Sequence, residues 1–152
     1  LSRMEELGCE IGNHSFDHAD LATLSAEDVT SQLSRTDEEI QNLVGHSATV
    51  VRPPYGSFND TVAGIAARPL IMWSVDTLDW ETQNADSTVQ NVMDNAQDGA
   101  IILMHDIFKE SVDAAEVFIP QLIQEGYQLV TVSELAAAKG ITLEAGTSYG
   151  AF

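Results

Sequence analysis

Ala100-Ile101-Ile102-Leu103-Met104 is an unbroken apolar run that follows Gly99 and ends at His105. A continuous apolar segment of this length, placed between a glycine and a polar residue, is typical of a strand buried on both faces of a parallel sheet. Parallel strands need crossover connections, which are usually helices. The run therefore predicts an α/β domain.

The segments on either side of this run alternate between strand-like and helix-like patterns. Short segments rich in β-branched or apolar residues predict strands, and apolar residues three and four apart predict helices. Ser25 and Ser111 are the expected N-caps of two of the helices. We expect strands at 9–14, 49–52, 70–75, 100–104 and 128–132, and helices at 2–7, 26–44, 59–67, 87–98, 111–125 and 133–139. The alternation fits an incomplete barrel or an open sheet, in one domain over residues 1–152.

The charge of the chain excludes several classes of partner. It has 24 acidic and 6 basic residues, a formal net charge of −18, and a hydrophobic fraction of 44%. The bases are scattered, so we expect neither nucleic acid nor an anionic membrane surface as a partner. No apolar run approaches the roughly 20 residues that span a bilayer. Cys9 is the only cysteine and can form no intramolecular disulfide.

Chemically distinctive residues follow four of the predicted strands. In α/β folds the active site forms from the loops at the carboxyl ends of the strands. We therefore expect the loops that follow residues 13, 51, 75 and 104 to meet at one edge.

The first of these loops contains His14-Ser15-Phe16-Asp17-His18. Two imidazoles four residues apart can both reach one divalent metal if the loop forms a helical turn. The alternative is two surface histidines near the start of a helix.

The second loop is Arg52-Pro53-Pro54-Tyr55-Gly56. The two prolines fix φ and remove two backbone donors, so the N–H of Tyr55 is the first free donor on a stiff backbone. Such an N–H could face a developing oxyanion. The alternative is a rigid turn in which Arg52 forms a structural ion pair.

The third and fourth loops add carboxylates, an indole and an imidazole. Trp80, beside Asp76 and Asp79, could stack on a sugar face or belong to the core. His105 is the best candidate for a general acid or base, because an unperturbed imidazole titrates near neutral pH. The alternative for His105 is a hydrogen-bonded core histidine, and we expect His46 to lie on the surface.

The order of these motifs carries more information than any one of them. His-Ser-x-x-His, Arg-Pro-Pro-Tyr-Gly, Asp-x-x-Asp-Trp and Leu-Met-His-Asp occur in that order between His14 and Asp106. This order resembles the polysaccharide deacetylases of the NodB-homology type, the fourth carbohydrate esterase family. The resemblance implies a distorted, incomplete (β/α) barrel and metal-dependent removal of acetyl groups from a glycan. The expected substrate is an acetylated polysaccharide or oligosaccharide, such as the N-acetylglucosamine units of peptidoglycan or chitin-like polymers.

The resemblance assigns a role to each motif residue. His14 and His18 would bind a divalent metal, with zinc expected and cobalt or another first-row ion possible. Arg52 would orient the catalytic base, and the backbone N–H of Tyr55 would help to hold the oxyanion.

The later motifs would supply the acid and the sugar-binding surface. His105 would be the general acid that protonates the leaving amine, and Asp79 would lie behind it. Trp80 would form a wall of the sugar groove, and Leu103 would line the pocket for the acetyl methyl group.

The chain departs from the family pattern in two ways. The first family motif, Thr-Phe-Asp-Asp-Gly, supplies the base and the third metal ligand, and it does not occur in this sequence. We expect it roughly 30 residues or more upstream of His14, so that the chain lacks its first strand and most of its first helix. Alone, the chain is expected to have little or no activity. The second departure is a short link at residues 66–70 that lacks an expected glycine.

Two other functions fit the same residues. The chain could be a carbohydrate-binding pseudoenzyme on this fold, or an unrelated α/β metal hydrolase with a chance pair of histidines. The family resemblance also places the protein in the cell envelope or outside the cell, although the chain carries no targeting signal.

Overall fold

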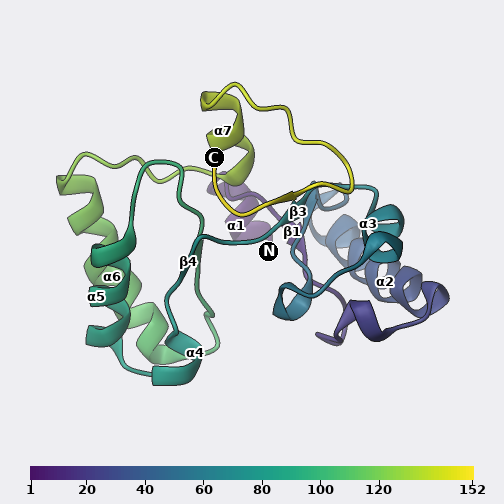
Figure 1. The fold of residues 1–152 in the computed structure, drawn as a ribbon, viewed down its shortest axis with the longest axis horizontal. Coiled ribbons are helices and arrows are strands. Elements are labelled where there is room, and N and C mark those ends of the chain that lie inside the picture. The colour runs from purple at the N-terminus through teal and green to yellow at the C-terminus, as the bar shows by residue number, and fades with distance from the viewer. The chain divides into compact units, whose positions relative to one another are not determined.

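The computed structural model describes all of residues 1–152, which form two compact units (Figure 1). The first unit comprises Leu1–Met72 and Thr131–Tyr149. The second comprises Trp73–Val130 and Gly150–Phe152. Each unit has its own sheet and its own apolar core, and each is described separately below.

The sheet of the first unit has the strand order β1-β2-β3-β6 and is parallel throughout. Its strands are short: β1 is Gly12–Asn13, β2 is Val50–Val51, β3 is Leu70–Ile71 and β6 is Ser148–Tyr149. In the register, Asn13 is opposite Val51, and Val51 is opposite Leu70. The parallel pairing agrees with the α/β prediction.

The longest helix of the first unit begins and ends as its sequence predicts. The hydroxyl oxygen of Ser25 accepts a hydrogen bond from the N–H of Asp28 at 3.1 Å, which caps α2 (Ala26–Val44). Gly45 ends the helix in the left-handed conformation that favours glycine, with φ at 87°. The other helical elements are α1 (Ser2–Glu6), η1 (Leu21–Thr23), η2 (Pro54–Gly56), α3 (Asp60–Ala66) and α7 (Val132–Ala138).

Apolar side chains from α2, α3 and the sheet form the main core of the first unit. Val29 and Leu33 of α2 pack with Val51 of β2 and Val62 of α3, and all four are buried. Burying a side chain of this size contributes about 1.5–3 kcal/mol. A second cluster of Ile11, Ile40 and Ala48 extends this core toward the start of β1.

The second unit pairs two strands and packs two helices against each other. β4 (Val75–Asp76) is parallel to β5 (Ile102–Leu103). Figure 1 shows α5 (Ala85–Asn95) and α6 (Lys109–Gln124) side by side, and a one-turn helix, α4 (Asp79–Thr82), precedes them. The core residues of this unit are Val92, Ala114, Phe118 and Leu122.

The end of the chain is attached to the second unit through Gly99. The N–H of Phe152 donates to the carbonyl of Gly99 at 3.0 Å. A Cβ at Gly99 would lie 1.9 Å from the carbonyl oxygen of Phe152, and φ there is 91°. Only glycine fits this turn.

Two of the strand predictions are wrong. The predicted strand 70–75 is two strands, β3 and β4, because Met72 donates to the Tyr149 carbonyl and Ser74 to the Ile101 carbonyl. The two halves of the segment thus pair with different sheets. The predicted strand 128–132 does not form, because residues 128–131 pair with no other strand and Val132 already belongs to α7. The sequence prediction also missed β6.

The predicted start of one helix and the N-cap of another are also wrong, because α5 begins before Ser87 and Ser111 is not the N-cap of α6. The side chain of Asn84, rather than Ser87, caps α5, and Asn84 accepts from the N–H of Ser87 at 2.9 Å. Ser111 lies within the first turn of α6, whose N-cap position is Phe108. No helix in the structure is long and apolar enough to cross a membrane.

Candidate active site

The loop after β1 brings the two motif histidines of the first unit together. The ring centroids of His14 and His18 are 4.9 Å apart, with the rings edge to face. The loop is a bend and not the helical turn that was the condition for a shared metal, because Ser15 and His18 have φ of 63° and 58°. The spacing therefore places the rings together, but through left-handed residues that the sequence did not reveal.

The tautomer of His14 is fixed by a backbone carbonyl. Its Nδ1 lies 2.5 Å from the carbonyl oxygen of Arg52, which can only accept. Nδ1 is therefore the protonated nitrogen, and Nε2 carries the lone pair that a metal would require.

The guanidinium of Arg52 is half-buried and has backbone partners only. Nε donates to the carbonyl of Ile71 at 3.2 Å, and Nη2 donates to that of Met72 at 3.4 Å. No carboxylate of the chain lies within ion-pair distance of Arg52. The structural ion pair considered for Arg52 is therefore absent, and burial lowers the pKa of this side chain.

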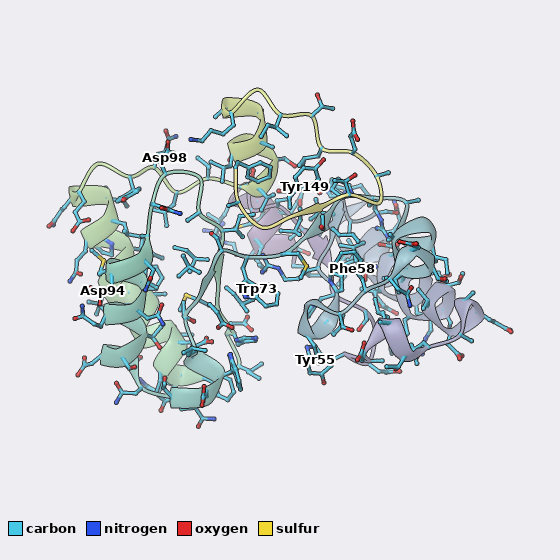
Figure 2. The ribbon with its side chains drawn as sticks, viewed as in Figure 1. Tyr55, Phe58, Trp73, Asp94, Asp98 and Tyr149 are labelled. Atoms are coloured by element: carbon cyan, nitrogen blue, oxygen red, sulfur yellow. The ribbon has the colours of Figure 1, made fainter.

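The turn after Arg52 has the stiff geometry that its prolines predict. Gly56 N–H donates to the Pro53 carbonyl and Ser57 N–H to the Pro54 carbonyl, and the N–H of Tyr55 is not among these bonds. Tyr55 has φ of 59°, and its side chain is 69% exposed. Figure 2 shows Tyr55 at the outer edge of this loop, and its ring lies 4.8 Å from that of His18.

The second unit holds a buried carboxylate against the other candidate histidine. Asp79 is 1% exposed, and its Oδ1 lies 2.8 Å from Nδ1 of His105. Its oxygens also accept from the backbone N–H of His105 at 2.7 Å, from Ser111 Oγ at 2.7 Å and from the Trp80 N–H at 2.9 Å. The carboxylate therefore has four donors and no water-exposed face.

These contacts determine the ionisation of Asp79. Burial alone would raise the pKa of Asp79, but the hydrogen bonds from Ser111 and His105 favour the carboxylate and hold its pKa below the usual value. Because an ionised Asp79 can only accept, Nδ1 of His105 is protonated and Nε2 is the nitrogen that can exchange a proton. The His105 side chain is 32% exposed, which does not fit the alternative of a core histidine.

Trp80 and Leu103 differ in exposure. Trp80 is 49% exposed, and its indole N–H lies 3.4 Å from Oδ1 of Asp76. Trp80 is therefore not a core residue. Leu103 is buried, and its carbonyl accepts from the hydroxyl of Thr77 at 2.8 Å.

The structure brings the candidate residues together in two groups. His14, His18, Arg52 and Tyr55 form one group in the first unit. His105 and Asp79 are in contact in the second unit, where Trp80 and Leu103 also lie. Their catalytic roles, and the meeting of the four loops at one edge, stay predictions.

Sequence reasoning missed several residues that support these groups. Ser111 was expected to cap a helix, but it donates to Asp79. Gln32 accepts from the N–H groups of Phe16 and Asp17 at 2.9 Å, so α2 holds the loop of the two histidines. His46 lies on the surface as predicted, and it pairs with Glu5 at 3.0 Å.

Comparison with known proteins agrees with the motif order. A family model described as polysaccharide deacetylase matches residues 1–69. The peptidoglycan-N-acetylmuramic acid deacetylase PdaC of Bacillus subtilis is 42% identical over 91% of the chain. The peptidoglycan-N-acetylglucosamine deacetylase PgdA of Listeria monocytogenes is 38% identical over 98% of the chain.

A solved structure described as T48 deacetylase with substrate gives the structural match. It superposes with a TM-score of 0.93 at 38% identity, over 97% of this chain and 73% of that one. The chain therefore belongs to the polysaccharide deacetylase family. Its fold class is the α/β fold of the NodB-homology type, as the sequence predicted, and an unrelated metal hydrolase is excluded.

The chain matches only part of its curated relatives. It spans 30% of the length of PdaC and 31% of the length of PgdA. The single-domain boundary and the absence of a first strand and helix stay predictions.

Proposed function

We propose that the chain forms most of the catalytic domain of a metal-dependent deacetylase that removes acetyl groups from a cell-envelope glycan. The N-acetylglucosamine units of peptidoglycan or of a chitin-like polymer are the proposed substrate. Family membership supports the reaction class, and the names of PdaC and PgdA support peptidoglycan. The observation that carries the proposal is that Nδ1 of His14 and Nδ1 of His105 each donate a hydrogen bond to an oxygen. In each ring this leaves Nε2 available, in His14 to bind a metal and in His105 to transfer a proton.

We propose His14 and His18 as metal ligands. Their adjacent rings and the protonated Nδ1 of His14 fit a metal such as zinc or cobalt. A related family 4 acetyl xylan esterase from Clostridium thermocellum was solved with a cobalt ion, at 28% identity and a TM-score of 0.92. When bound, the metal would polarise the acetyl carbonyl and activate water.

The donor set in this chain is smaller than a catalytic zinc site needs. No group of three or more His, Cys, Asp or Glu side chains in the structure could hold a metal. Catalytic zinc normally has three protein ligands, so a pair should bind it weakly. The half-buried Arg52 without a carboxylate partner supports a role in orienting a base that these 152 residues lack.

Of the remaining residues, Tyr55 and His105 would act on the amide directly, and Arg52 and Asp79 would act through a neighbouring group. The N–H of Tyr55, on a backbone fixed by two prolines, would donate to the oxyanion. Arg52 would orient the base that takes the proton from the attacking water. His105 would give a proton from Nε2 to the leaving nitrogen, while Asp79 stabilises the imidazolium through Nδ1.

The substrate would lie between an indole and an aliphatic side chain. The exposed face of Trp80 offers a broad apolar surface on which a sugar ring can stack. Leu103 would contact the acetyl methyl group.

The test is acetate release from acetylated chito-oligosaccharides and from peptidoglycan. We expect little turnover from the 152 residues with added zinc or cobalt, and much faster turnover from a version that carries a Thr-Phe-Asp-Asp-Gly segment before residue 1. His105→Ala in that version should abolish most of the rate, whereas His46→Ala should not change it. Equal rates with and without the segment, or an active His105→Ala variant, would contradict the proposal.

A second candidate is a carbohydrate-binding pseudoenzyme. It is supported by a family 4 pseudoenzyme from Bacillus anthracis, which is 34% identical over 88% of this chain with a TM-score of 0.81. Glycan binding without acetate release, in a natural full-length protein that lacks the Asp-Asp pair, would favour this reading.

A further inference from the structure

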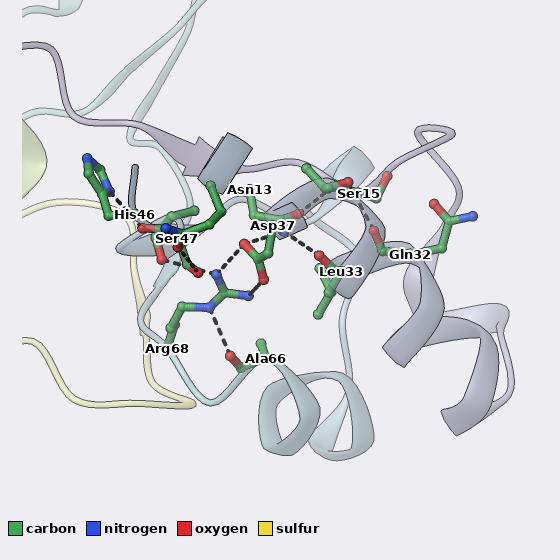
Figure 3. Close-up of polar contacts among 12 residues, drawn as sticks. Asn13, Ser15, Gln32, Leu33, Asp37, His46, Ser47, Ala66 and Arg68 are labelled. Atoms are coloured by element: carbon green, nitrogen blue, oxygen red, sulfur yellow. Dashed lines mark hydrogen bonds and ion pairs between the residues drawn. The ribbon is translucent and has the colours of Figure 1, made fainter. Parts of the chain in front are cut away.

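The loop of the two histidines is tied to α2 through one buried amide. Asn13, the last residue of β1, is fully buried. Its Oδ1 accepts from the N–H of Ser15 at 3.0 Å. Its Nδ2 donates to the Leu33 carbonyl at 2.9 Å and to Oδ1 of Asp37 at 3.0 Å (Figure 3).

These three bonds fix which way the Asn13 amide faces. A flipped amide would point its NH₂ group at the N–H of Ser15 and its oxygen at the Leu33 carbonyl. Asp37 stabilises the observed orientation, because its carboxylate can accept a hydrogen bond only from the NH₂ group of Asn13.

Asp37 is in turn held by a bidentate ion pair. Nη1 of Arg68 donates to Oδ1 of Asp37 at 2.7 Å, and Nη2 donates to Oδ2 at 2.8 Å. The same guanidinium donates to the carbonyls of Ala48 and Ala66, both at 3.1 Å. The Arg68 and Asp37 side chains are 19% and 20% exposed, so solvent competes little for this pair. This bidentate ion pair fixes the plane of the Asp37 carboxylate, and it therefore fixes which oxygen Asn13 contacts.

The loop needs such support because its backbone is unfavourable. Ser15 has φ of 63°, a conformation that residues other than glycine adopt rarely. The hydroxyl of Ser15 is buried and has no hydrogen-bond partner, so it does not hold the residue in place. The hydrogen bond from the Ser15 N–H to Oδ1 of Asn13 is therefore the polar contact that holds Ser15, the residue next to His14.

We propose that Asp37 and Arg68 are positioning residues for the metal-binding loop. They act through Asn13 on Ser15, and they set the affinity of His14 and His18 for a divalent cation without touching it. This inference rests on the proposed role of the two histidines as metal ligands.

The test separates positioning from simple stabilisation. The variants are Asp37→Ala, Arg68→Ala and Asp37→Asn, and the matched control is Val62→Ala, which opens the apolar core of the same unit but removes none of these hydrogen bonds. Global stability of every variant is measured by urea unfolding, so that effects on the loop are compared at known stability.

The first readout is hydrogen exchange of the Ser15 amide in the metal-free chain. The reference is the Val51 amide, which donates to the Pro69 carbonyl within the sheet. In Asp37→Ala and Arg68→Ala we expect the protection of the Ser15 amide to fall about tenfold more than that of the Val51 amide. In Val62→Ala the two amides should change together.

The second readout is Co²⁺ affinity, followed by the absorption of the bound ion. Loss of a group that orients a metal ligand typically weakens binding 10–100-fold, and we expect about tenfold for Asp37→Ala and Arg68→Ala. Asp37→Asn keeps an oxygen for Asn13 but loses the ion pair, so its effect should be intermediate. Val62→Ala should stay within about twofold of the parent chain.

Each outcome decides a separate claim. If Ser15 exchange and Co²⁺ affinity in the Asp37 and Arg68 variants change only as much as global stability predicts, as in Val62→Ala, the ion pair merely stabilises the fold. The inference is then wrong. If neither the parent chain nor the longer version with the Thr-Phe-Asp-Asp-Gly segment binds Co²⁺, the proposed metal site is wrong. Ser15 exchange then still shows whether the pair orders the loop.

Discussion

Replacing Asp79 by Asn tests the buried carboxylate with the smallest change of shape. The carboxylate accepts from two backbone N–H groups, those of His105 and Trp80, and from two side chains, Ser111 and His105. An Asn has one acceptor oxygen and one NH₂ group, so half of this arrangement must change.

Either orientation of the new amide leaves a backbone donor without an acceptor. With NH₂ in place of Oδ1, His105 can change tautomer and accept, but the Trp80 N–H has no partner. With NH₂ in place of Oδ2, the Ser111 hydroxyl can turn and accept, but the His105 N–H has no partner. One buried unpaired donor, together with the loss of charge-assisted bonds, should cost about 2–4 kcal/mol.

Urea unfolding at neutral pH measures this loss. The matched control is Asp76→Asn in the same loop, where the carboxylate is only partly buried and accepts from Leu78 N–H and the Trp80 indole. We expect the control to cost less than about 1 kcal/mol. A loss for Asp79→Asn no larger than that of Asp76→Asn would refute the reasoning.

The effect of Asp79→Asn should also depend on pH. The folded pKa of Asp79 lies below the ordinary value of an aspartate, 3.8, so its contribution to stability is complete above that pH and is lost as pH falls through the folded pKa. The difference in stability between parent and variant should therefore shrink below about pH 4. A difference that stays constant or grows as pH falls would contradict the lowered pKa.

The same variant separates stability from catalysis. In an active, longer version of the chain, Asp79→Asn should move the basic limb of the pH–rate profile to lower pH, because the imidazolium of His105 loses its carboxylate partner. An unchanged limb would remove Asp79 from the proposed acid catalysis while leaving its structural role intact.

Three further predictions concern single contacts. Ser111→Ala removes one donor from the buried carboxylate and should cost about 1–2 kcal/mol in urea unfolding; a neutral result would contradict its role. The Ser47 carbonyl and then Glu5 raise the pKa of His46 above 6.5, so NMR titration should give a higher value, and Glu5→Gln should lower it. The stabilising effect of this pair is present below about pH 6.5 and is lost as pH rises through the folded pKa, and a titration at or below 6.5 would contradict it. Ala67 has φ of 47°, a left-handed conformation that glycine adopts more easily than alanine, so Ala67→Gly should raise the free energy of unfolding by roughly 0.5 kcal/mol. A clear decrease would show that Ala67 is not strained.

Local signals in the sequence were sufficient for α2 and α3 of the first unit. Ser25 and Gly45 mark the two ends of α2, and its bounds agree with the prediction. Asn59 and Ala67 likewise lie directly outside α3. A cap acts within one turn, so neighbouring residues determine it and the sequence displays it.

The strands were harder to predict because their partners are distant in the sequence. Residues 70–75 form one apolar run, but Met72 bonds to Tyr149 and Ser74 to Ile101, and no local pattern shows this division. β6 is two residues long and follows a turn at Gly146, so it has almost no pattern of its own.

The candidate site shows the same division between local and distant information. The sequence showed the spacing of His14 and His18, but the left-handed backbone that brings their rings together came only from the structure. Asn13, Asp37 and Arg68 are far apart in sequence and individually ordinary. Their connection depends on α2 lying against β1, which composition and spacing do not encode.

The most direct test of a metal-dependent deacetylase is acetate release before and after the metal is removed. A longer version carrying the Thr-Phe-Asp-Asp-Gly segment is stripped with a chelator and then given one equivalent of Co²⁺ or Zn²⁺. The account predicts that activity is lost on stripping and returns with the metal, but does not return in His14→Ala or His18→Ala. Full turnover by the stripped protein, or full recovery in either histidine variant, would contradict it.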